Sequence, residues 1–148
     1  AEVTKDYKEL LELLNEKKVK YLIVGAHALA FHGHPRFTGD IDILVNPTEE
    51  NAKKILEVLN DFGFASLGLE MSDFTTEYNI IQLGFPPVRI DFLTTIDGVT
   101  WSDAEKGSVE GFYGDVPVRY IGKKEYIKNK KASGRLKDLA DIEAIEQN

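Results

Sequence analysis

The sequence predicts an α/β or α+β domain built on a mixed β-sheet that is flanked by helices. Two observations carry this prediction. In the first half, short apolar runs alternate with amphipathic helical segments, whereas later runs follow one another across short turns, as antiparallel strands do. With 148 residues and no internal repeat, low-complexity tract or linker, we expect residues 1–148 to form a single domain with a full core.

Composition excludes several classes of protein. The hydrophobic fraction of 43% and charged fraction of 29% are ordinary for globular proteins. No apolar run is long enough to cross a bilayer, and the first residues lack a signal-peptide pattern, so we expect no membrane partner and, by default, a cytoplasmic location. The absence of cysteine excludes disulfides and thiolate metal sites.

Charge is unevenly distributed. The net charge of −7 argues against nucleic-acid binding driven by overall charge. One short stretch is nevertheless basic, with cations at Lys123, Lys124, Lys128, Lys130, Lys131, Arg135 and Lys137. A solvated helix face is the usual explanation of such a run.

The N-terminal elements are predicted from periodicity and stop signals. Apolar residues at the i, i+3, i+4, i+7 spacing indicate a helix over 4–18 with Thr4 as N-cap. The apolar run 21–24 indicates a buried strand, and the helix 26–31 that follows is stopped by Gly33 and Pro35.

The remaining elements follow from the same signals. Strands are expected at 40–45, 64–69, 78–83 and 88–93, a hairpin at 109–113 and 116–121, and helices at 48–60, 123–132 and 136–146. Thr48 is the expected N-cap of its helix, and Gly134 separates the last two helices. Residues 96–108 carry no clear pattern, although Trp101 is expected to anchor them by packing.

Two carboxylates stand at the start of the strand at 40–45. Asp40 and Asp42 are two residues apart, so in a strand they project from one face while Ile41 and Ile43 project from the other. Paired carboxylates repel each other unless a cation lies between them, and magnesium prefers such hard oxygen ligands. The alternative is a chance pattern at a solvent-facing strand end.

Gly25 and Ala26 mark the passage from the first strand into a helix. Free N–H groups at a helix start favour an anion, and glycine lets a phosphate approach the backbone closely. The alternative is that Gly25 only makes a tight turn.

In the run 88–93, Ile90 and Phe92 share one strand face and Asp91 takes the other.

These pieces resemble the nucleotidyltransferase superfamily typified by DNA polymerase beta. Its pattern is h-G-[G/S], then D-h-[D/E] about a dozen residues on, then a third carboxylate on a neighbouring strand. The matching segments are Val24-Gly25-Ala26, Asp40-Ile41-Asp42 and Ile90-Asp91-Phe92. The runs 24–42 and 130–141 look like small stand-alone prokaryotic members, which include components of toxin–antitoxin pairs. The resemblance implies a polymerase-beta palm-like fold.

The resemblance also implies a chemistry. Asp40 and Asp42 would be shared ligands of two Mg²⁺ ions, and Asp91 would complete the second metal site and help to deprotonate the attacking hydroxyl. The substrate would be an NTP whose terminal phosphate lies at Gly25 and Ala26. Ala26 departs from the pattern, because it lacks the hydroxyl of a serine and leaves only backbone N–H groups.

Other candidates for nucleotide binding carry alternatives. Arg36 and Thr38 are candidates for phosphate or base contacts, although Arg36 could equally form a surface salt bridge. Lys130 and Lys137 match the family-like C-terminal run, and Lys137 is interpreted as a phosphate ligand. Asp138 is interpreted instead as a packing residue paired with Arg135 or a lysine. The three histidines, His27, His32 and His34, lack a ligand spacing and are interpreted as surface or packing residues.

Three functions remain open at this point. The first is magnesium-dependent transfer of a nucleotidyl group from an NTP to a hydroxyl of an RNA, a protein or a small molecule. The second is a nucleotidyltransferase fold kept as a binding or regulatory module, with a partner protein or as a homo-oligomer. The third is a magnesium-dependent hydrolase or nuclease. The transferase hypothesis requires that the three carboxylates converge and that no salt bridge fills the gap between them.

Overall fold

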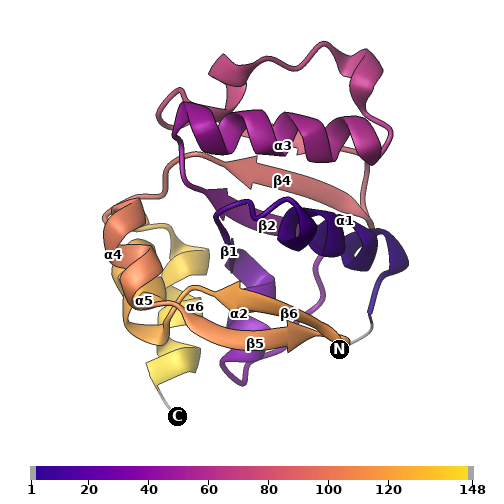
Figure 1. The fold of residues 1–148 in the computed structure, drawn as a ribbon. Coiled ribbons are helices and arrows are strands. Elements are labelled where there is room, and N and C mark those ends of the chain that lie inside the picture. The colour runs from indigo at the N-terminus through magenta and orange to yellow at the C-terminus, as the bar shows by residue number, and fades with distance from the viewer. Residues whose placement is uncertain (1–2, 147–148) are drawn as a thin grey trace.

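The computed structural model describes residues 3–146, whose strands form one six-stranded mixed sheet in the order β3-β4-β2-β1-β6-β5 (Figure 1). Parallel pairing joins β2 to β4 and β1 to β6, and the other three pairs are antiparallel. The strands are β1 (Tyr21–Val24), β2 (Asp40–Val45), β3 (Ile80–Leu83), β4 (Arg89–Leu93), β5 (Val109–Tyr113) and β6 (Val116–Tyr120). The predicted mixed sheet flanked by helices is confirmed.

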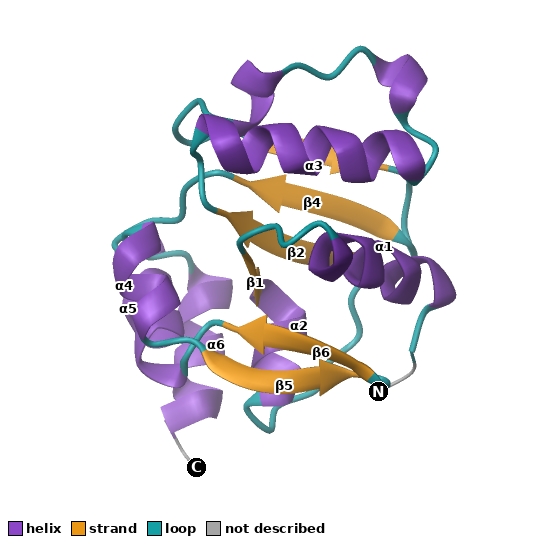
Figure 2. Cartoon of the chain, in the orientation of Figure 1, coloured by secondary structure: helices purple, strands orange, loops and turns teal. Residues whose placement is uncertain are grey.

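Helices and short 3₁₀ turns connect the strands (Figure 2). They are α1 (Lys5–Glu16), α2 (Gly25–Phe31), α3 (Glu49–Asp61), η1 (Ala65–Leu67), η2 (Met71–Phe74), α4 (Trp101–Lys106), α5 (Lys123–Ser133) and α6 (Leu136–Glu146). The Thr48 hydroxyl accepts a hydrogen bond from the Asn51 N–H at the start of α3, as its sequence position predicts. Gly134 adopts a left-handed conformation between α5 and α6.

One face of the sheet is apolar and covered. Side chains of β2 and β4 alternate, so Ile41, Ile43, Ile90 and Phe92 are buried on this side. Helices α1 and α3 contact each other over it and appear on the near side of the sheet in Figure 1. Phe74 of η2 is fully buried and packs edge-on against the Phe92 ring. Burial of these side chains therefore fixes which residues of β2 and β4 must face the other way.

The opposite face carries the polar residues and is only partly covered. Helix α2 begins against the side chain of Asp42, and Lys130 of α5 shares a cleft with the same strand. The α5–α6 pair gathers at one end of the molecule in Figure 1. No helix among residues 3–146 covers the β3–β4 end of this face, where Ile80 and Gln82 are exposed.

The structure corrects two parts of the sequence prediction and fills in a third. The strand expected at 64–69 is wrong, because only a 3₁₀ turn forms there, between the positive-φ residues Gly63 and Gly68, and Leu67 is exposed. The strand expected from residue 78 begins at Ile80, since Tyr78 has a φ of 56°. The unassigned 96–108 segment contains α4, whose first residue, Trp101, packs against the core.

None of the helices in residues 3–146 combines the length and hydropathy that a bilayer crossing requires.

Candidate active site

Three carboxylates meet on the polar face of the sheet. Parallel pairing of β2 with β4 places Asp42 opposite Asp91, and Asp40 precedes Asp42 on the same face. One oxygen of each carboxylate lies within 4.8 Å of an oxygen of each of the other two. Among residues 3–146 this is the one cluster of histidine, aspartate and glutamate that could hold a metal ion. The acids that the sequence places on separate strands therefore converge.

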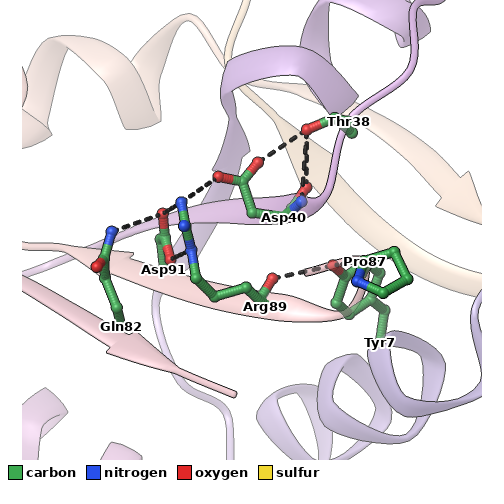
Figure 3. Close-up of polar contacts among 7 residues, drawn as sticks. All are labelled: Tyr7, Thr38, Asp40, Gln82, Pro87, Arg89 and Asp91. Atoms are coloured by element: carbon green, nitrogen blue, oxygen red, sulfur yellow. Dashed lines mark hydrogen bonds and ion pairs between the residues drawn. The ribbon is translucent and has the colours of Figure 1, made fainter. Parts of the chain in front are cut away.

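Arg89 fills part of the space between them, and nothing in the sequence analysis anticipated this. Its Nη2 lies 2.7 Å from Asp40 Oδ2, and its Nε lies 2.8 Å from Asp91 Oδ1 (Figure 3). A second bond of 2.9 Å joins Nη2 to Asp91 Oδ2. The signal was present, because Arg89 stands two residues before Asp91 on a strand and so shares its face. The requirement that no salt bridge lie between the acids is therefore not met for Asp40 and Asp91, and only Asp42 stays outside the ion pair.

Asp42 is left outside this ion pair. Its side chain accepts no hydrogen bond and forms no ion pair with a residue in the described part of the chain. Burial and the charges of Asp40 and Asp91 raise its pKa to about 7, against the weaker opposing effects of Lys130 and Arg89. One guanidinium therefore leaves the three carboxylates short of positive charge, and hard oxygen donors in that state fit a divalent cation such as Mg²⁺.

The close approach of Gly25 to Asp42 explains the glycine at the start of α2. Gly25 has a φ of 65°, and a Cβ built on it would lie 2.1 Å from Asp42 Oδ2. The glycine therefore admits the carboxylate as well as making a turn. Ala26 is buried, and both residues line the cleft described below.

Neighbouring polar groups orient Asp40 and Arg89. The Thr38 hydroxyl donates to Asp40 Oδ1 at 2.8 Å, so Thr38 positions a carboxylate. The Tyr7 hydroxyl of α1 donates to the backbone oxygen of Arg89 at 2.9 Å, which ties β4 to the helix on the other face (Figure 3). Gln82 of β3 lies at the limit of hydrogen bonding, 3.5 Å from Asp91 Oδ2.

A cleft of about 570 Å³ contains the three acids. Its second wall comes from α5 and α6 and is basic, with Lys130, Arg135 and Lys137 lining it. Lys130 and Arg135 are paired with the buried Asp138, at 3.0 and 2.7 Å respectively, whereas Lys137 has no ion-pair partner in the described residues. This wall offers positive charge a short distance from the carboxylates.

Arg36 joins the loop before β2 to the last helix. Its Nη1 lies 2.7 Å from Oδ1 of Asp141 on α6, and the Asp141 side chain is 8% exposed. Arg36 therefore forms a salt bridge, which was the alternative to a phosphate or base contact, but this bridge is half-buried and does not lie on the surface. Arg36 lines the cleft from this fixed position.

The structure brings all of the sequence-predicted site residues to one cleft. Its lining includes Gly25, Ala26, Arg36, Thr38, Asp40, Asp42, Asp91, Lys130 and Lys137. Asp138 lies behind the wall as the common acceptor of Lys130, Ser133 and Arg135, which is the packing role expected of it. His27 packs between the Tyr7 and Tyr113 rings, and His32 hydrogen-bonds the Ile121 carbonyl, in keeping with packing roles.

Comparison with solved structures places this arrangement among nucleotidyltransferase folds. A candidate nucleotidyltransferase from Thermotoga maritima matches with a TM-score of 0.59 and 14% identity over 95% of this chain and 88% of its own. The lincosamide antibiotic adenylyltransferase LnuA, solved with lincomycin bound, matches with a TM-score of 0.58 and 16% identity over 99% of this chain and 98% of its own. No family model and no curated protein matches the sequence. The fold that the resemblance implied is confirmed.

Proposed function

We propose that this protein is a magnesium-dependent nucleotidyltransferase, which moves an NMP from an NTP to a hydroxyl group. The observation that carries the proposal is the meeting of Asp40, Asp42 and Asp91 on adjacent strands with too little positive charge to balance them. The likeness in fold to a candidate nucleotidyltransferase and to an adenylyltransferase supports the same reaction class. Nucleotidyl transfer depends on positioning and charge neutralisation, which this cleft can provide.

Asp40, Asp42 and Asp91 are the residues that would hold two Mg²⁺ ions. Bound Mg²⁺ would neutralise the phosphate charge and polarise the reacting oxygens. Lys130 and Lys137 would bind the triphosphate from the α5–α6 wall, with Arg36, Thr38 and the backbone of Gly25 and Ala26 along the cleft floor. In the reaction the acceptor oxygen forms a bond to the α-phosphorus, the bond to pyrophosphate breaks, and Asp91 accepts the hydroxyl proton.

A binding and transfer experiment tests the proposal. Calorimetric titration of Mg·ATP, Mg·CTP, Mg·GTP and Mg·UTP into the protein should show binding of at least one nucleotide that is lost without Mg²⁺. The same nucleotide, labelled at the α-phosphorus, should label an acceptor in a cell lysate, and Asp40→Asn should reduce this labelling at least a hundredfold. Lack of binding by every NTP in the presence of Mg²⁺ would overturn the proposal.

A second candidate is a nucleotidyltransferase fold that serves as a binding or regulatory module, for example within a toxin–antitoxin pair. Two observations favour it: Arg89 already pairs with two of the acids, and Ala26 supplies no hydroxyl. Co-purification with a partner protein, together with an unchanged biological effect of Asp42→Ala, would support this candidate. Loss of the effect with Asp42→Ala would support the enzyme.

A further inference from the structure

The two walls of the cleft differ in charge. The α5–α6 wall presents Lys130, Arg135 and Lys137. The opposite wall includes Tyr78, Ile80 and Gln82, from β3 and the segment before it, and none of these is a lysine, arginine or histidine. A polyanion would therefore find counter-charges on one wall of this cleft and none on the other.

Apolar side chains extend from Asp91 along the cleft wall that carries no cations. In the β3–β4 pairing Gln82 lies opposite Asp91, and Ile80 lies opposite Leu93 on the same face. The Ile80–Leu93 pair is one strand repeat, about 7 Å, from the Gln82–Asp91 pair. Tyr78, Ile80 and Leu93 all line the cleft, and we call these three residues the apolar platform. Ile80 itself is 56% exposed, and isoleucine is usually buried.

Tyr78 is held over the cleft in a strained conformation. Its φ of 56° is uncommon for a residue with a Cβ and is one of two such values among non-glycine residues in the described chain. Its N–H donates to the Thr95 hydroxyl at 3.0 Å, which fixes this turn just before the start of β3. The ring is 67% exposed and lines the cleft instead of packing in the core. Strain that exposes an aromatic ring at a cleft is typical of a binding surface.

We propose that the apolar platform binds the acceptor, and that the acceptor is a small hydroxyl compound with an apolar group and a neutral or positive charge. The proposal rests on the proposed function. With the apolar group on Ile80 and Leu93, a hydroxyl about 7 Å away reaches Asp91. Asp97 also lines the cleft, but it lies against α5, where its carbonyl accepts a hydrogen bond from Asn129 and its charge acts on Arg135. An RNA acceptor is disfavoured because single-stranded nucleic acid requires a positively charged groove along its backbone.

Methyl NMR of the full chain tests the platform without any need for turnover. The probes are tyramine, which carries a phenol and an ammonium, its carboxylate counterpart 3-(4-hydroxyphenyl)propionate, and total tRNA. Tyramine at millimolar concentration should shift the Ile80 and Leu93 methyl signals, and the carboxylate should bind at least fivefold more weakly. tRNA should leave both signals unshifted.

A pair of variants separates binding at the platform from general effects. Ile80→Lys places a cation on exposed edge strand β3 and should weaken tyramine binding at least fivefold. Val109→Lys makes the same change on the other edge strand, β5, where Val109 is 38% exposed, and should have no effect.

The outcomes distinguish this proposal from the proposed function. Absence of shifts at Ile80 and Leu93 with tyramine, or equal binding of the carboxylate, would overturn the platform. Transfer of an α-phosphorus label to RNA or to protein would also overturn it. Shifts with tyramine in a protein that binds no Mg·NTP would leave the platform standing and the transferase proposal overturned.

Discussion

Asp138 and Asp42 differ in the number of hydrogen-bond donors around their carboxylates and in the direction of their pKa shifts. Asp138 is fully buried, and it accepts hydrogen bonds from Lys130, Ser133 and Arg135. Burial alone would raise its pKa, but these three donors together lower the pKa to about 2. Asp42 is partly buried and has no such donor, and burial raises its pKa to about 7. The Asp138 carboxylate thus has three hydrogen-bond donors, whereas the Asp42 carboxylate has none.

The difference indicates what each site is for. A buried carboxylate with a full set of donors stabilises the packing of the helices that supply them. Carboxylates left short of positive charge oppose folding, because the charged form loses hydration without replacement. Such a deficit is typical of sites that receive a cation or a proton during function. The comparison therefore indicates a structural role for Asp138 and supports the proposed metal-binding role of Asp40, Asp42 and Asp91.

Removal of the Asp138 charge should have the largest effect on stability. Asp138→Asn leaves Lys130 and Arg135 without their shared carboxylate and should destabilise the protein by about 3 kcal/mol. Thermal unfolding followed by circular dichroism should show a melting temperature lower by roughly 6–12 °C. Glu143→Gln, an exposed acid on the same helix, is the matched control. Equal melting temperatures for the two variants would show that Asp138 has no structural role.

Crowding of Asp42 should have the next largest effect. Gly25→Ala introduces a Cβ against Asp42 Oδ2 at a φ of 65° and should cost about 2 kcal/mol, while moving the carboxylate away from Asp40 and Asp91. Gly134→Ala is the control, because Gly134 has a φ of 67° and no atom within 4 Å of a Cβ, so it reports backbone strain alone. Only Gly25→Ala should also weaken Mn²⁺ binding in a calorimetric titration. Parallel results for the two variants would show that Asp42 tolerates the contact.

Removal of the competing cation should strengthen metal binding. Arg89→Gln frees Asp40 and Asp91 and should raise the affinity for Mn²⁺ or Mg²⁺ about tenfold, or about 1.4 kcal/mol, in the absence of nucleotide. Arg119→Gln, which breaks an exposed pair with Glu110, should leave the affinity unchanged. Unchanged or weaker affinity in Arg89→Gln would mean that the guanidinium supports the cluster instead of competing with a metal ion.

The pH dependence of stability should differ in sign between the two acids, with the smallest effect at Asp42. A raised folded-state pKa means that the native protein holds a proton that the unfolded chain has released, so the Asp42 contribution falls as pH rises from about 4 through about 7. Asp138, with its lowered pKa, contributes above pH 4 and loses its contribution as pH falls toward 2.

Thermal unfolding at pH 5 and pH 8 tests the Asp42 slope. Asp42→Asn should lack it and should gain on the order of 1 kcal/mol relative to wild type at pH 8, after allowance for solvent screening. A wild-type protein whose stability relative to Asp42→Asn is the same at pH 5 and pH 8 would show that Asp42 is adequately neutralised in the fold.

Strand alternation made the faces of the sheet predictable, and the resemblance to the nucleotidyltransferase superfamily implied that the three acids meet. The pattern in residues 40–45 and 88–93 places isoleucine and phenylalanine on one face and aspartate on the other, which is what the structure shows. The strand expected at 64–69 failed for a local reason, because glycines at 63 and 68 turn the chain on both sides of a three-residue segment. Apolar content without alternation was a poor guide there.

Long-range polar pairs were beyond sequence reasoning. Arg36 and Asp141 are 105 residues apart and pair only because α6 packs near the loop before β2. The Gly25–Asp42 contact likewise depends on how β1 and β2 pair, although each residue was singled out for another reason. Arg89 could have been found, since the spacing that puts Asp40 beside Asp42 also puts Arg89 beside Asp91.

The bond between Arg36 and Asp141 has a consequence for the order in which the protein matures. During translation the strands that carry the acids leave the ribosome before residues 123–146, which supply the basic wall. The basic wall of the cleft therefore cannot form until these residues have been synthesised. On the proposed function, a triphosphate could be held only after residues 123–146 have been synthesised and Asp141 has reached Arg36.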